Sequence, residues 1–111
     1  GKVKTFSEEL NYYLDILSKF TDWIKEKHND DKDDVSAAAN DYLKTLGFVS
    51  LAYSWIKVLN VSYNEYDSNK KFYDDKINTA KFYFEKVLPR AELHYKSAIS
   101  GSSNIMNFKF N

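Results

Sequence analysis

The sequence contains no cysteine, one proline and three glycines in 111 residues. The absence of cysteine excludes disulfides, thiolate metal sites and cysteine nucleophiles. It also fits a reducing compartment, so we expect a cytoplasmic protein. So few prolines and glycines leave too few turn residues for a β-sandwich or a β-barrel. Gly1, Gly47 and Gly101 lie too far apart to form a glycine-rich phosphate loop.

An excess of either charge is also missing, because 16 Lys and Arg residues balance 16 Asp and Glu residues. A neutral chain has no overall electrostatic attraction to nucleic acid or to anionic lipid. No run approaches the roughly 18–20 apolar residues that span a membrane, and the first residues lack the apolar stretch of a secretory signal. Gly1 in place of methionine indicates a processed or truncated start.

What the sequence does contain is apolar residues at helical spacing. Hydrophobic residues make up 43% of the chain, which is typical of a folded protein, and the length suits one domain over residues 1–111. The first helix is expected from about Ser7 to Lys27, with Thr5 and Glu8 as a capping box. Its apolar positions, three or four residues apart for the most part, are Phe6, Leu10, Tyr13, Leu14, Leu17, Phe20 and Ile24.

The second helix is expected from about Val35 to Val61, and from Leu46 onward it is apolar on most of its circumference. Its polar or small exceptions form one narrow stripe: Gly47, Ser50, Ser54, Lys57 and Asn60. A helix with this pattern is buried on several sides. Two neighbouring helices of a small bundle would cover only part of its apolar arc.

The third helix is expected to follow a loop over residues 62–70, with Asp67 or Ser68 as its cap. Pro89 should kink or break this helix, and Gly101 should stop it. The tail after Gly101 carries Ile105, Met106, Phe108 and Phe110 and is expected to dock. The fold class is therefore all-α, with three long antiparallel helices. The expected core residues are Leu46, Val49, Tyr53, Ile56, Ile77, Ala80 and Phe84.

No catalytic, cofactor-binding or metal-binding residue can be named from the sequence. His28 and His94 are the only histidines and lie on different expected elements without an evident partner. The acidic stretch over residues 28–34 could bind a metal ion, but it lacks the glycine and glutamate of a calcium loop. Capping of the second helix is the favoured interpretation of its aspartates. No di-iron Glu-x-x-His pair occurs either.

A basic and aromatic segment suggests a second alternative, single-stranded nucleic acid binding. The segment contains four lysines, Lys70, Lys71, Lys76 and Lys81, beside four aromatic residues, Phe72, Tyr73, Phe82 and Tyr83. The positive charge is interrupted by Asp74, Asp75 and Glu85, so we expect no nucleic acid partner. Asp74 and Asp75 are instead expected to form i,i+4 ion pairs with Lys70 and Lys71.

The aromatic residues number 9 Tyr, 8 Phe and 2 Trp, more than a three-helix bundle comfortably buries. Tyrosine and tryptophan are enriched at protein interfaces. We therefore expect part of this surface to contact another protein or another part of its own polypeptide.

Three segments of the chain, in order, carry a family resemblance. They are Asn40-Asp41-Tyr42-Leu43-x-x-x-Gly47-x-Val49-x-x-Ala52-Tyr53-x-Trp55, Phe72-Tyr73-x-x-Lys76-x-x-Thr79-Ala80-x-Phe82-Tyr83-Phe84-Glu85-x-Val87-Leu88-Pro89, and Ile99-x-Gly101-Ser102-x-x-Ile105-Met106. Together they resemble the C-terminal extension domain of the large acyl-CoA dehydrogenases. The similarity is clearest from about Ala38 to Met106. Each segment matches loosely, and their order and spacing carry the resemblance.

The resemblance implies a noncatalytic helical domain of a larger FAD-dependent flavoprotein that desaturates acyl-CoA thioesters. In that family the glutamate base and the FAD site lie in preceding domains, and no motif here matches them. The implied partner is the catalytic body of the same polypeptide or a partner subunit, with acyl-CoA as substrate of the parent oxidoreductase only.

Two other hypotheses remain open at this stage. One is a free-standing helical interaction module without enzyme activity. The other is a helical domain that associates with a membrane surface, which is disfavoured because such helices usually carry a cationic face.

Overall fold

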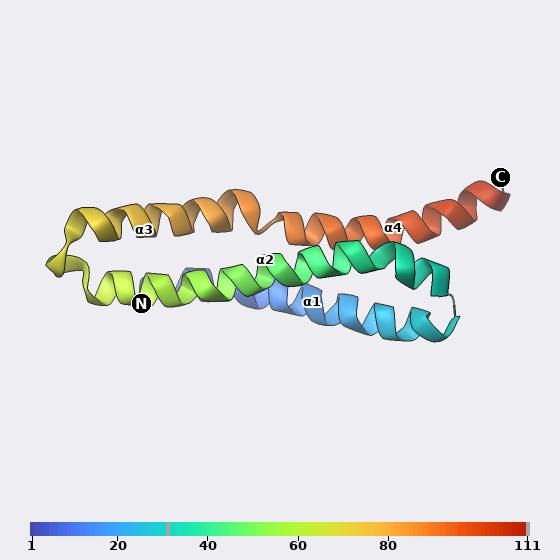
Figure 1. Cartoon of the computed structure of the whole chain (residues 1–111), viewed down its shortest axis with the longest axis horizontal. Helices are drawn as coiled ribbons and strands as arrows, with labels where there is room; N and C mark the ends of the chain where they lie inside the picture. The colour runs from blue at the N-terminus through green and yellow to red at the C-terminus, as the bar shows by residue number, and fades with distance from the viewer. Residues whose placement is uncertain (31, 111) are drawn as a thin grey trace.

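Three helical rods lie side by side in a molecule of 62 × 23 × 19 Å (Figure 1). The computed structural model describes the backbone of residues 1–30 and 32–110 and the side chains of residues 1–28 and 35–100. The elements are α1 (Lys4–Asp30), α2 (Lys32–Asn64), the 3₁₀ turn η1 (Tyr66–Ser68), α3 (Lys70–Phe82), the π-helical turn η2 (Tyr83–Val87) and α4 (Arg90–Phe110). Within the described residues there is no strand, so the all-α prediction is confirmed.

The connectivity is up-and-down, with α2 contacting both of the other rods. α1 runs along α2, α2 returns, and α3 and α4 follow one another along the other side of α2 (Figure 1). The expected third helix is thus two helices in line. Short connections favour such antiparallel neighbours.

α1 begins earlier than expected, at Lys4. The Val3 carbonyl accepts the Ser7 amide at 3.0 Å, so Thr5 lies inside the first turn and the predicted capping box is wrong. Val3 and Phe6 are half-buried against the core, and this packing extends the helix toward the N-terminus. The acidic connection is also shorter than expected, since α1 ends at Asp30 and α2 begins at Lys32. The predicted capping by its aspartates concerns side chains outside the described residues.

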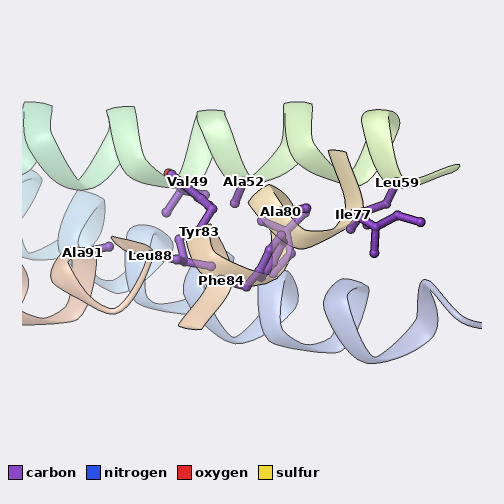
Figure 2. Close-up of a cluster of buried hydrophobic side chains, with 10 residues drawn as sticks. Val49, Ala52, Leu59, Ile77, Ala80, Tyr83, Phe84, Leu88 and Ala91 are labelled. Carbon is purple, nitrogen blue, oxygen red and sulfur yellow. The ribbon is translucent and has the colours of Figure 1, made fainter. Parts of the chain in front are cut away.

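The main core lies where α2 meets α3, η2 and the start of α4 (Figure 2). This core is one cluster of ten buried residues from all three rods. They are Leu10 of α1; Val49, Ala52 and Leu59 of α2; Ile77 and Ala80 of α3; Tyr83 and Phe84 of η2; and Leu88 and Ala91. Alanines on α2, α3 and α4 let these helices approach closely. Toward the other end, the fully buried Phe20 ring of α1 lies 5.2 Å from the Tyr42 ring and 5.3 Å from the Tyr95 ring.

Four of the seven predicted core residues, Val49, Ile77, Ala80 and Phe84, are buried, and Ile56 is half-buried. The prediction is wrong for two residues of α2, since Leu46 is 39% and Tyr53 is 55% exposed. The small side chains of Ala38, Thr45 and Ala52 occupy the inward positions instead. Apolar periodicity cannot choose a face on a helix that is apolar nearly all round.

The predicted break at Pro89 is confirmed, and it comes with a π-helical turn. Pro89 has no amide hydrogen to donate. Just before it, the Leu88 amide donates to the Tyr83 carbonyl at 2.8 Å, five residues back. Such π turns are local distortions of an α-helix. The distortion divides the rod into α3 and α4.

Two further predictions about helix ends are wrong. Asn69, not Asp67 or Ser68, caps α3, because its side-chain oxygen accepts the Phe72 amide at 3.3 Å. α4 continues through Gly101 to Phe110. A glycine inside a helix costs only about 1 kcal/mol, so it does not by itself end one. The predicted docking of the tail concerns side chains outside the described residues.

Candidate docking surface

His94 has a partner that the sequence did not reveal. Its Nδ1 lies 2.8 Å from Oδ1 of Asp41 on α2, and its ring stacks on Phe48 with centroids 5.9 Å apart. Next to this pair, the fully buried Thr45 hydroxyl shares its one donor hydrogen between the carbonyl oxygens of Asp41, at 2.9 Å, and Ala91, at 3.2 Å. These polar contacts join α2 to α4. The threonine hydroxyl has no access to solvent, so it stabilises the contact between α2 and α4.

Tyr83 is buried in the core, and its hydroxyl donates to the Phe48 carbonyl. Burial raises the pKa of Tyr83 to about 12, so the phenol stays protonated at neutral pH. Its ring lies 6.4 Å from Trp55. Tyr83 therefore acts as an anchor between η2 and α2.

His28 lies exposed in the last turn of α1, where a cation suits the helix dipole. Across the described residues, no group of three or more His, Asp or Glu side chains could hold a metal ion. Of the two expected ion pairs on α3, Lys71 pairs with Asp75 at 3.9 Å. Asp74 instead accepts a hydrogen bond from the Tyr66 hydroxyl at 2.8 Å.

The most unusual surface of the described chain is the outward side of α2. Large apolar side chains stand exposed along it, led by Leu43 at 64%. We call this surface the open face of α2, and its exposed apolar residues are Leu43, Leu46, Leu51, Tyr53 and Val61. Residues 43–61 span about 27 Å, or five turns, at 1.5 Å per residue. A solvated helix normally exposes polar residues there.

Small residues lie in the middle of the open face. The polar stripe expected from the sequence is indeed exposed, with Gly47, Ser50 and Ser54 among the large apolar residues. A Cβ added at Gly47 would meet no atom within 4 Å. The fold of this chain therefore does not require glycine here, although glycine costs a helix roughly 0.5–1 kcal/mol relative to alanine.

A groove between α2 and α3 lies beside the open face. We call it the α2–α3 groove; it encloses about 370 Å³ and is lined by Trp55, Lys57, Val58, Val61, Ser62, Phe72, Tyr73 and Lys76. Lys57 Nζ lies 4.7 Å from the centroid of the Tyr53 ring, and Lys76 Nζ lies 5.2 Å from that of Phe72. Cation–π contacts of this kind hold a lysine over an aromatic face.

A second hollow, of about 700 Å³, lies near η1 and is of mixed character. Lys2 and Lys81 line it together with Asp67 and Asp74. Its charges balance, and Tyr63, Tyr66 and Ile77 supply its apolar part.

The geometry thus defines a class of protein, an all-helical bundle with an apolar face that its own helices leave open. The chain belongs to the acetyl-CoA dehydrogenase C-terminal-like family, whose model matches residues 1–109. This agrees with the resemblance found in the sequence. No curated protein and no solved structure matches the chain. In the part of the chain that the structure describes, no helix combines the length and the apolar character needed to cross a bilayer.

Proposed function

We propose that this chain is the noncatalytic C-terminal helical domain of an FAD-dependent acyl-CoA dehydrogenase, and that it packs against the catalytic body or a partner subunit. The observation that carries the proposal is the open face of α2, with Leu43 and Tyr53 more than half exposed. Monomeric proteins rarely leave large contiguous apolar patches exposed, and such patches mark interaction sites. The family match supplies the kind of enzyme to which the face would belong.

Gly47 supports docking of a helix at this face. Its lack of a side chain is not used within the chain, since no atom lies near the position of a Cβ. Small residues at a helix surface let a second helix approach closely, and Ser50 and Ser54 continue the same stripe. The leucines and Tyr53 beside the stripe would then close over the incoming helix.

The flavin and the acyl-CoA substrate belong to the parent enzyme in this proposal. A glycine-rich phosphate-binding loop needs several glycines at a helix N-terminus, whereas Gly47 lies inside α2. FAD in the parent enzyme would accept the electrons removed from the acyl-CoA thioester in fatty acid metabolism. The residues of this chain would bury apolar surface and fix the position of the catalytic body. The absence of cysteine suits a cytoplasmic location for such an enzyme.

The experiment that tests the proposal is an immunoblot of extract from the source cells with an antibody raised against this chain. A band several-fold larger than 13.0 kDa is expected. Copurification of that band with bound flavin and acyl-CoA dehydrogenase activity would support the assignment to this enzyme class. A band near 13 kDa would contradict it and favour the second candidate, a free-standing interaction module that uses the same open face.

A further inference from the structure

The α2–α3 groove has the shape that a third helix fills. Two antiparallel helices in contact leave a groove on each side of their seam, and a further helix packs into such a groove by ridges and grooves. α1 lies on one side of this seam, where its Leu10 belongs to the same buried cluster as Ala52 of α2 and Ala80 of α3. All residues lining the α2–α3 groove come from α2 and α3, and none comes from α1. The side of the seam that carries the groove is therefore not covered by α1.

The lining of the groove indicates the character of that helix. Trp55, Val58, Val61, Phe72 and Tyr73 supply apolar and aromatic surface. Val61 and Phe72 are both about half exposed. Grooves of this kind bind the apolar face of an amphipathic helix, with anchors three or four residues apart.

The charges of the groove indicate the flanks of that helix. The whole chain is neutral, yet the groove is lined by two lysines and by no acidic residue. Lys57 comes from α2 and Lys76 from α3, and each ammonium group lies over a neighbouring aromatic ring. A partner helix with acidic side chains beside its apolar face would be complementary to both lysines.

We propose that the α2–α3 groove binds an amphipathic helix of the catalytic body that carries carboxylates next to its apolar face. Apolar side chains of that helix lie against Trp55, Val58 and Phe72, and its carboxylates lie against Lys57 and Lys76. The origin of the helix rests on the proposed function. The chemistry of the groove does not.

The test uses two designed helical peptides with the same leucines at i, i+3, i+4 and i+7. One peptide has glutamates beside the leucines and the other has lysines. Each is titrated into the Trp23→Phe variant of the chain, whose remaining tryptophan, Trp55, lines the groove and reports binding by fluorescence. Circular dichroism verifies that every variant keeps the helical content of the parent chain.

The glutamate peptide is expected to bind about tenfold more tightly than the lysine peptide at low salt, because two rim charges change from attraction to repulsion. In a Lys57→Glu/Lys76→Glu variant the order of the two peptides should reverse. A matched control, Lys4→Glu/Lys25→Glu, makes the same charge change on exposed positions of α1 and should keep the original order.

Equal binding of both peptides, or no change in Trp55 fluorescence with either, would overturn the proposal. The chain could instead self-associate through this groove. If it does, and if the Lys57→Glu/Lys76→Glu change abolishes that self-association, the groove binds a second copy and the proposal is overturned. The immunoblot gives a separate answer. If the native band is large but the titration fails, only the assignment of the groove is refuted. If the glutamate peptide binds selectively but the native band is near 13 kDa, only the catalytic body is refuted as the source of the helix.

Discussion

Replacing Phe84 by alanine is expected to lower the free energy of unfolding by about 4 kcal/mol. The Phe84 side chain belongs to the π-helical turn η2, is 3% exposed and packs against α1. Its ring contacts Phe6 edge-on at 5.1 Å and Tyr83 at 6.1 Å between centroids. One substitution therefore removes contacts that join two of the three rods.

The magnitude follows from the buried area. An aromatic side chain buries about 150 Å² or more, which at 25 cal/mol/Å² corresponds to about 4 kcal/mol. The methyl group of alanine recovers part of this loss, and the cavity and the lost ring contacts add to it. Measured Phe→Ala changes in cores fall at about 3–5 kcal/mol, in agreement with this sum.

The assay is equilibrium urea denaturation followed by circular dichroism at 222 nm, with Phe82→Ala as the control. Phe82 is the same residue type two positions earlier, but it is 59% exposed. Its replacement should change the free energy of unfolding by less than about 0.5 kcal/mol. A loss below about 1 kcal/mol for Phe84→Ala, or equal losses at both positions, would show that Phe84 does not lie in the core.

Three further outcomes are expected. Gly47→Ala should stabilise the chain by roughly 0.5–1 kcal/mol in thermal and urea denaturation, because the added methyl group meets no atom within 4 Å; destabilisation would contradict this packing. Thr45→Val should lower the free energy of unfolding by about 1–2 kcal/mol, because it removes the buried hydroxyl. Ser54→Ala on the exposed face is the control and should have a negligible effect; equal effects of the two changes would refute this prediction. Between pH 10 and 12 the folded chain retains the Tyr83 proton more tightly than the unfolded chain, since the folded pKa is raised from 10.0 to about 12. The stability present below pH 10 should therefore fall as the pH rises through this range. Tyr83→Phe should remove this component of the fall, and parallel pH profiles of the two proteins would contradict it.

The helical fold could be predicted because local patterns determine it. Apolar residues three and four apart define α1 and α3, and Pro89 lacks the amide that a continuous helix needs. Helix ends were less predictable because packing extends them. Val3 and Phe6 contact the core and draw the start of α1 to Lys4, and Gly101 does not stop α4.

The surface could be predicted only in general terms. An excess of aromatic residues and a helix apolar nearly all round indicated an uncovered apolar surface, but they did not show which side of α2 is outward. That choice depends on tertiary contacts of small residues, such as Ala52 against α3 and Thr45 against Ala91. The contact between His94 and Asp41 was likewise not predictable, because the two residues lie 53 positions apart and no local pattern relates them.

The central claim is that the open face of α2 is covered in the native protein. Hydroxyl-radical footprinting tests it most directly, by comparing Tyr53 in the isolated chain with Tyr53 in the polypeptide purified from source cells. Tyr12 on α1, at 52% exposed, serves as the reference for Tyr53 at 55%. The account predicts that Tyr53 is oxidised in the isolated chain and protected in the native protein, while Tyr12 reacts equally in both. Equal oxidation of Tyr53 in the two samples would contradict the account.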